Sequence, residues 1–242
     1  MTGPAVLALW SAPRSRSTAF QRMMDARGDR IVLHEPFSRR ADFGAVEVAG
    51  QTVTDEPALI AAITALGART PVFFKDTTDF AYPGLLADQD FLASARHTFL
   101  LRHPAEAIAS HARLTADLGR DEIGFARLAE IRDAVAAATG RAPVVVDSDD
   151  LLERPEEVVR AYCAAVGIPF RPAALHWRPG LRDGEEGTSR WHESTSRTSG
   201  FVRGRGDIGA AEATVRADPV LAAHLDFHLP HYERLRRERL RV

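Results

Sequence analysis

VLALWSAPRSRSTAF (residues 6–20) runs from an apolar segment, through a turn rich in hydroxyl groups and arginine, into a stretch with helical spacing. The run VLALW is short and continuously apolar, which is typical of a strand buried on both faces. Phe20, Met23 and Met24 then give the spacing of an amphipathic helix. The stretch therefore predicts a strand, a tight turn and a helix, with the turn at the carboxyl end of the strand.

Strand-like apolar runs recur along the chain, and helical patterns separate them. The apolar runs cover residues 5–10, 30–34, 71–75, 97–101 and 142–146. The helical stretches after the first strand cover residues 56–68, 104–114, 124–140 and 154–167. This alternation predicts an α/β fold with a mostly parallel central sheet flanked by helices on both faces. We expect one domain over residues 1–242.

Composition and charge narrow the functional classes. The 242 residues carry 31 basic and 33 acidic side chains, so the formal net charge of −2 does not fit a general binder of polyanions such as nucleic acids. No apolar run approaches the length of a membrane span, and no secretory signal is evident, so we expect a cytoplasmic protein that does not bind membranes. The lone cysteine, Cys163, excludes an intramolecular disulfide and a cysteine zinc cluster, and we expect it to be buried.

The periodic pattern breaks down between about residues 175 and 209. Long segments of this kind are usually functional loops or disordered segments. Because Trp177, Trp191 and Phe201 lie in it, we expect an irregular lid or wall over the site. The arginine-rich tail at 232–242 is typical of a solvated helix face.

The turn after the first strand has the chemistry to bind an anion. In a parallel α/β sheet the ligand lies beyond the carboxyl ends of the strands, and amides at the start of a helix have no partner within it. Ser15, Ser17 and Thr18 add hydroxyl donors, and Arg14 can hold phosphate or sulfate oxygens. A serine-capped helix with surface arginines is the structural alternative. The turn lacks the glycines and the lysine of a Walker A loop, so we expect a smaller anionic group that needs no metal.

A second anion-binding feature follows the fourth strand. Arg102 ends that strand, Pro104 opens the next helix, and Ser110 lies about two turns along it. Arg102 and Ser110 could hold one phosphate from two sides. A helix cap with a salt bridge would explain the same residues.

Together these two segments resemble the sulfotransferase family that uses 3′-phosphoadenosine 5′-phosphosulfate (PAPS) as its donor. In that family a turn of the form P-[KR]-S-G-[ST]-T cradles the 5′-phosphosulfate, and an arginine followed eight residues later by a serine binds the 3′-phosphate. PRSRST (13–18) is similar to the first pattern, with Arg16 where many members have glycine, and Arg102 with Ser110 is similar to the second. The resemblance implies a fold like that of P-loop NTPases. The donor-binding residues that it implies in these segments are Arg14, Ser15, Arg16, Ser17, Thr18, Arg102 and Ser110.

SGFVRGRGDIG (199–209) resembles a third pattern of the family, F-x-R-K-G-x-x-G-D, which covers the nucleotide. The resemblance implies that Arg203 binds the 3′-phosphate, that Gly204 allows close approach of the backbone, and that Arg205 adds a contact. Gly204 stands where the family pattern has lysine, so the agreement is partial.

Sulfuryl transfer needs an in-line approach of the nucleophile and cations that stabilise the charge on the leaving group. Arg14 is expected to meet that charge. Lys75, the single lysine of the chain, follows the third apolar run and could supply a second cation. Many sulfotransferases place a histidine two residues after such a lysine, but Thr77 occupies that position here, so the general base must come from elsewhere.

The end of the second strand offers a substitute base. Glu35 is the first candidate, His34 the second, and Asp76, after the third strand, the third. Pro36 would hold the residue before it in an extended conformation at the rim of the sheet. The structural alternative pairs Glu35 with a nearby arginine and leaves His34 in the core.

The expected activity is transfer of the sulfuryl group from PAPS to the hydroxyl of a small alcohol or phenol, without a metal. Several aromatic residues could line an apolar acceptor pocket or belong to the core: Phe37, Phe80, Tyr82, Trp177 and Trp191. Two other functions stay open, a P-loop-like kinase or nucleotide hydrolase and a non-catalytic nucleotide-binding module. Neither the identity of the acceptor nor the oligomeric state follows from the sequence.

Overall fold

A five-stranded sheet forms the centre of the computed structural model, which describes residues 3–180, 198–202 and 206–242. Its strands are β1 (Val6–Ser11), β2 (Ile31–His34), β5 (Val72–Thr77), β6 (Arg96–Leu101) and β7 (Val144–Asp147). They stand in the order β2-β5-β1-β6-β7, and every neighbouring pair is parallel. The expected parallel sheet is confirmed, and each strand lies within two residues of its predicted bounds.

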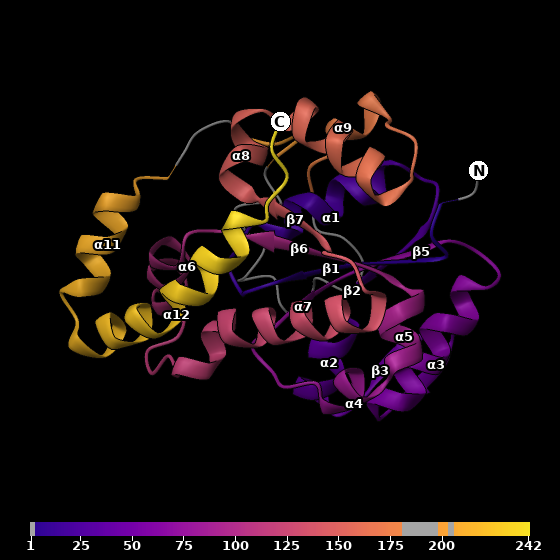
Figure 1. Ribbon diagram of the computed structural model, residues 1–242, viewed down its shortest axis with the longest axis horizontal. Coiled ribbons are helices and arrows are strands. Elements are labelled where there is room, and N and C mark those ends of the chain that lie inside the picture. Colours follow the sequence, from indigo (N-terminus) through magenta and orange to yellow (C-terminus); the bar gives the residue numbers. More distant parts are fainter. Residues whose placement is uncertain (1–2, 181–197, 203–205) are drawn as a thin grey trace.

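Helices cover both faces of this sheet, as the alternation in the sequence predicts (Figure 1). One face carries α1 (Ser17–Ala26), α8 (Ser148–Glu153) and α9 (Pro155–Val166). The other face carries α2 (Pro36–Phe43), α3 (Glu56–Gly67), α4 (Pro83–Ala87), α5 (Gln89–Ser94) and α7 (Phe125–Thr139). Of the helices on these two faces, those that the sequence pattern did not indicate are short or polar: α2, α4, α5 and α8.

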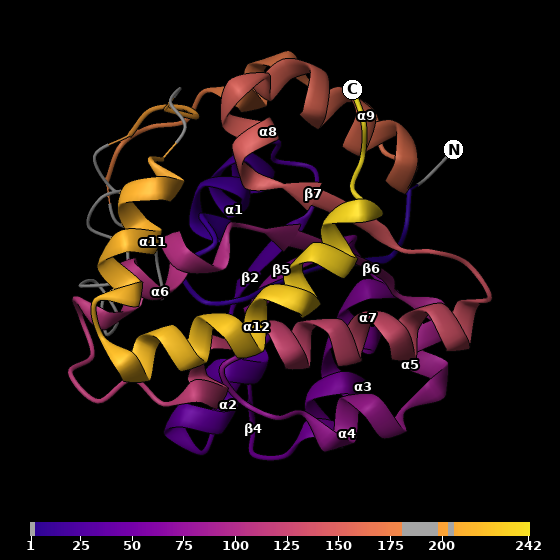
Figure 2. The ribbon, with the colours of Figure 1, turned by 60° about the vertical axis from the view of Figure 1, so that its left-hand side comes forward.

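The remaining elements lie at the edges of this layered core. Figure 2 shows α12 (Pro219–Arg237) beside α7, and α11 (Ile208–Arg216) packs on α6 (Pro104–Ala112). The smaller elements are the antiparallel hairpin of β3 (Val46–Val48) with β4 (Gln51–Val53) and the 3₁₀ turns η1 (Arg120–Ile123) and η2 (Pro172–Leu175). No helix in the described ranges is both long enough and apolar enough to cross a bilayer.

Alternation along β1 divides the core into two layers. Val6, Ala8 and Trp10 belong to the cluster under α2, α3 and α7, whereas Leu7 and Leu9 belong to the cluster under α1 and α9. Successive side chains of a strand point to opposite faces, so a strand that is apolar at every position fills both layers. The continuous apolar run in the sequence is therefore explained by burial on both sides.

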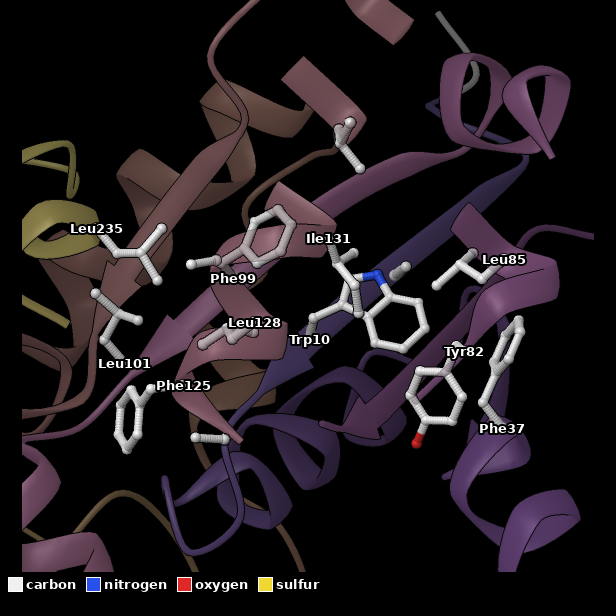
Figure 3. Close-up of a cluster of buried hydrophobic side chains, with 14 of the residues drawn as sticks. Trp10, Phe37, Tyr82, Leu85, Phe99, Leu101, Phe125, Leu128, Ile131 and Leu235 are labelled. Atoms are coloured by element: carbon white, nitrogen blue, oxygen red, sulfur yellow. The ribbon is translucent and has the colours of Figure 1, made fainter. Parts of the chain in front are cut away.

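Most of the aromatic residues considered for the acceptor pocket are core residues instead. Trp10 packs against Phe37 and Tyr82, with ring centroids 5.4 and 5.8 Å apart (Figure 3). Trp177 is buried against Phe201, with 5.2 Å between the ring centroids. Trp191 lies outside the described residues, and Phe80 is the one member of the set that the described chain places at the cavity of the candidate site. Of the two alternatives left open for these rings, the structure therefore favours the core for Phe37, Tyr82 and Trp177.

The C-terminal tail is packed more closely than a fully solvated helix would be. Tyr232 and Leu235 are buried on the inner side of α12. The Nε of Arg236 lies 3.0 Å from the Asp147 carboxylate at the end of β7. One side of the tail is thus part of the core, and Arg239 is held in the same way by a contact of 2.9 Å with Asp150. Cys163 is buried in α9, as expected, and burial raises the pKa of its thiol.

His97 is a buried neutral residue of β6, and this predicts a pH dependence of stability. Its Nδ1 accepts a hydrogen bond from Trp10 Nε1 at 3.0 Å, and its Nε2 donates to the Phe91 carbonyl at 3.3 Å. Burial lowers the pKa of His97 to about 4, below the value near 6.5 of an unfolded chain. The stabilising contribution of neutral His97 is therefore complete above pH 6.5 and is lost as the pH falls toward 4.

Comparison of His97→Gln with the wild type isolates this contribution. Between pH 7 and 4.5 we expect the wild type to lose about 2 kcal/mol more unfolding free energy than the variant, measured by urea unfolding. The other titrating groups are common to both proteins, so they cancel in the difference. Equal losses in the two proteins would contradict the assignment.

Candidate functional site

A cavity of about 880 Å³ opens where β1, β5 and β6 end. Strands β2 and β5 lie on one side of β1 in the sheet, and the later strands β6 and β7 lie on the other side. The strand order therefore reverses at β1. Ligands of open α/β sheets bind at such a point. The walls of the cavity come from the turn after β1, from α2 and α6, from the end of β5, and from residues 198–202.

The turn after β1 has an unusual backbone. Arg14 and Arg16 adopt φ angles of 65° and 66°, in the left-handed region that residues other than glycine rarely occupy. Each such residue costs on the order of 1 kcal/mol, so the surroundings must hold it in place. Arg16 stands at the glycine position of the pattern P-[KR]-S-G-[ST]-T. Glycine adopts this left-handed conformation without strain.

The side chain of Arg16 supplies the contacts that offset this cost. Its Nη2 lies 3.2 Å from Glu106 Oε2, and its Nη1 donates to Ser148 Oγ at 3.2 Å. Nη1 also donates to the carboxylate of Asp149. Arg16 thereby ties the turn to α6 and to the junction of β7 with α8. An arginine can stand at this position because distant carboxylates hold its side chain.

The turn presents hydrogen-bond donors to the cavity. All of residues 13–19 line it, and α1 begins at Ser17, so the first amides of the helix have no intrahelical acceptor. The hydroxyl of Ser15 is buried and has no hydrogen-bond partner among the described residues. Amides and an unsatisfied hydroxyl at a helix N-terminus fit an anion.

Arg102 and Ser110 reach the same cavity and brace the turn. Arg102 Nη1 donates to the Arg14 carbonyl at 2.8 Å, and Ser110 Oγ accepts from Arg14 Nε at 3.1 Å. Burial lowers the pKa of Arg14, and the charges of Arg102 and Arg113 lower it further. Several guanidinium groups therefore share one partly buried space, and a bound anion would offset their repulsion.

Glu106 is the carboxylate at the centre of this arrangement. It is 4% exposed, and its Oε2 accepts from Arg102 Nε at 3.0 Å as well as from Arg16. A Cβ added at Gly206 would lie 1.3 Å from Glu106 Oε1, so a larger residue at 206 would displace this carboxylate from its ion pairs. Arg203, Gly204 and Arg205, the donor contacts implied for the covering loop, lie outside the described residues.

Glu35 and Lys75 form an ion pair at the other side of the cavity. Lys75 is 1% exposed in β5, which continues to Thr77, and its Nζ donates to Glu35 Oε1. Glu35 adopts φ 47° and ψ 50° immediately before Pro36, so the extended conformation expected there is wrong. The Glu35 amide donates to the Lys75 carbonyl at 2.9 Å, and its carbonyl accepts from the amide of Arg39 in α2. These contacts and the ion pair with Lys75 hold the strained residue. The Glu35 carboxylate also lies 3.5 Å from His34 Nε2, and its charge acts on Arg14, the nearby arginine of the structural alternative.

The other two candidate bases lie outside the cavity lining. His34 Nδ1 is 2.8 Å from Gln21 Oε1, and its side chain is nearly buried toward α1. Asp76 is fully buried and accepts from the amides of Phe37 and Ser38, at 2.6 and 3.1 Å, which fixes the start of α2. Burial raises the pKa of Asp76 to about 7.

Several residues at the cavity were not singled out from the sequence. They are Ser38, Arg39, Asp42, Asp79, Arg113 and Glu122. Asp79 had a signal in the sequence, because it closes the polar run KDTTD that begins with Lys75. The residues on α2 had none, because that helix was not expected.

Comparisons with known proteins identify the family of the chain. A family model described as a sulfotransferase domain matches residues 5–236. The branched-chain-amino-acid aminotransferase-like proteins 1 and 2 of Arabidopsis thaliana are each 26% identical to the chain, over 215 and 211 residues that cover 83% and 81% of it. The chain spans about a third of their length, 37% and 36%.

Among solved structures, the sulfotransferase from Alicyclobacillus acidocaldarius is similar in fold. The match covers 98% of this chain and 96% of that one, with 15% identity and a TM-score of 0.50. It supports a sulfotransferase-like arrangement of the parallel sheet and its helices. Because the family match extends from β1 into α12, the chain belongs to the sulfotransferase domain family.

Proposed function

We propose that this protein transfers the sulfuryl group of PAPS to a hydroxyl group of a small-molecule acceptor. The observation that supports the proposal is that the turn 13–18 and the Glu35–Lys75 pair line the same cavity. The turn offers donors for the phosphosulfate, and the pair offers a carboxylate and a cation for the acceptor hydroxyl. Family membership supports the reaction type.

The donor would be held at two ends. The amides of the turn, with Ser15, Ser17 and Thr18, would bind the 5′-phosphosulfate. Arg102 and Ser110 would bind the 3′-phosphate, and Arg203, Gly204 and Arg205 would add contacts from the covering loop. Arg14, which already contacts Ser110, would lie between the two ends.

In the reaction, the acceptor oxygen attacks sulfur in line with the bond from sulfur to the bridging oxygen of the donor. That bond breaks, its electron pair stays on the 5′-phosphate of the product adenosine 3′,5′-bisphosphate (PAP), and the acceptor becomes a sulfate ester. Glu35 receives the proton of the acceptor hydroxyl. Arg14 and Lys75 stabilise the charge that develops on the transferring and leaving groups.

Thermal stabilisation by nucleotides tests the donor. We expect PAP without magnesium to raise the Tm by roughly 5–10 °C at about 100 times its Kd, because a ligand at that concentration adds about 2.7 kcal/mol. ATP with magnesium should change the Tm little, since the turn has no Walker lysine. The opposite ranking would contradict the proposal and favour a kinase or nucleotide hydrolase. Stabilisation by PAP without any transfer from PAPS would favour a non-catalytic nucleotide-binding module.

Arg102→Ala tests the end that binds the 3′-phosphate. A hydrogen bond to a charged group contributes about 1.5–3 kcal/mol, so we expect PAP affinity to fall about tenfold or more. Adenosine 5′-monophosphate, which lacks the 3′-phosphate, serves as the control ligand, and its affinity should change much less. Equal losses for the two nucleotides would show that Arg102 acts only by bracing the Arg14 carbonyl.

A further inference from the structure

The cavity has a second half, on the β2 and β5 side of β1, where an acceptor would lie if the proposed function holds. Arg102, which directly follows β6, and Ser110 of α6 are assigned to the 3′-phosphate and lie on the opposite side of β1. Ser38, Arg39 and Asp42 of α2 line the acceptor half, together with Thr77 and Asp79 at the end of β5. This wall is mostly polar, so an acceptor there meets polar groups as well as the ring of Phe80.

Most of these polar groups are already satisfied within the protein. Ser38 Oγ lies 2.9 Å from both Thr77 Oγ1 and the Tyr82 hydroxyl, and it donates to Asp76. Arg39 lies over the ring of Phe43, with its guanidinium carbon 5.6 Å from the ring centroid. The wall is therefore held in a fixed shape before any acceptor enters.

Asp79 differs from the rest of the wall because its Oδ1 is buried without a hydrogen-bond partner among the described residues. The Thr77 side chain satisfies part of its carboxyl group, and Arg127 Nη1 donates to its backbone carbonyl at 2.5 Å. These contacts fix the loop that carries Asp79. Burial, with the nearby charge of Glu35, raises the pKa of Asp79 to about 6. A buried oxygen that accepts no hydrogen bond is uncommon in a folded protein. A ligand with a hydrogen-bond donor at this position would satisfy Asp79 Oδ1.

The charge of the wall indicates which donor fits. Six cations line the cavity, Arg14, Arg16, Arg39, Lys75, Arg102 and Arg113, against four carboxylates, Glu35, Asp42, Asp79 and Glu122, so its lining is not acidic. A neutral hydroxyl group suits such a wall better than an ammonium group, which a strongly acidic wall would favour.

We propose that the acceptor is a small polyhydroxylated molecule, in which one hydroxyl receives the sulfuryl group beside Glu35 and a neighbouring hydroxyl donates a hydrogen bond to Asp79. This inference deepens the proposed function and rests on it. It assigns Asp79 as a residue that selects the acceptor, and it narrows the expected small alcohol or phenol to one with a neighbouring hydroxyl group.

Matched acceptors test the proposal. We would measure kcat/KM with PAPS for 4-nitrocatechol against 4-nitrophenol, and for cis-1,2-cyclohexanediol against cyclohexanol. In the wild type the dihydroxy member of a pair should be preferred about tenfold or more, as one hydrogen bond to a carboxylate allows. In Asp79→Ala the preference should fall to about twofold or less, mainly through a higher KM for the diol. Asp42→Ala, on the same wall, should retain it.

Two further measurements distinguish failure of the acceptor assignment from failure of the donor assignment. Asp79→Asn keeps one oxygen acceptor and is expected to recover part of the preference, which also covers the case in which the alanine variant fails to fold. Stabilisation by PAP is measured for every protein. A wild type that binds PAP but shows no preference for the diols, or an Asp79→Ala variant that retains the preference, overturns the acceptor assignment and leaves the donor assignment standing. A wild type that does not bind PAP overturns both.

Discussion

Glu35→Gln is expected to lower kcat about 100- to 10,000-fold while PAP affinity changes little. The carboxylate lies at the cavity, next to a cation, on a residue in a strained left-handed conformation. Strain of this kind persists where the surrounding structure enforces it, which is frequent at functional sites. Glutamine keeps the size of the side chain but cannot take the proton. The measurements are single-turnover transfer from PAPS and PAP binding by thermal shift, and wild-type turnover in the variant would remove Glu35 as the base.

A control must separate loss of the base from loss of the ion pair, because Glu35→Gln also leaves buried Lys75 without its carboxylate. Removal of one partner of a buried pair costs about 3–5 kcal/mol. The double variant Glu35→Gln, Lys75→Met should therefore recover much of the lost stability but not the activity. Glycine fits the left-handed backbone at position 35, so Glu35→Gly should keep the shape of the site. If the missing carboxylate is the base, added formate should restore part of the turnover of this variant. Failure of this rescue, with PAP binding intact, would contradict the assignment.

Glu106→Ala is expected to destabilise the protein strongly. The side chain is 3% exposed and neutralises both Arg16 and Arg102, whose side chains are 18% and 17% exposed. Its removal leaves two partly buried guanidinium groups without their shared carboxylate, at a cost of about 3–5 kcal/mol. For a chain of this length that corresponds to a fall in Tm of roughly 10 °C.

Glu156→Ala is the matched control for this experiment. Glu156 and Arg160 form a pair with the same four-residue spacing as Arg102 and Glu106, but their side chains are 57% and 58% exposed. Exposed pairs contribute about 0–1 kcal/mol, so the control variant should lose no more than a few degrees. Similar falls in Tm for both variants would show that burial of Glu106 has no special effect.

The sequence was sufficient to predict the elements of the sheet and the place of the site. Each main strand is an apolar run whose neighbours in the sequence have helical spacing, and this pattern depends on local residues alone. The turn at 13–18 could be assigned to the carboxyl edge of the sheet because ligands of parallel α/β sheets bind there and its residues suit an anion. In the structure this turn follows β1, where the strand order reverses.

The features that were missed depend on residues far apart in the sequence. Helix α2 begins where it does because Asp76 accepts from the amides of Phe37 and Ser38, about forty residues earlier in the chain. The left-handed conformation of Glu35 opposes the local preference before proline, and it is held by contacts with Lys75. The unsatisfied oxygen of Asp79 becomes evident only when all neighbouring donors are placed.

The conformation of Arg16 has a consequence for how the protein can change by mutation. A glycine at this position would form the same turn by itself, whereas the arginine depends on Glu106 and Asp149, which lie 90 and 133 residues away. The left-handed turn is therefore encoded jointly by segments from three parts of the chain. An evolutionary path between the arginine and glycine versions of this turn must exchange Arg16 and its carboxylate partners together or pass through a less stable intermediate. Transfer of the short motif alone into another scaffold would not carry the shape of the turn with it.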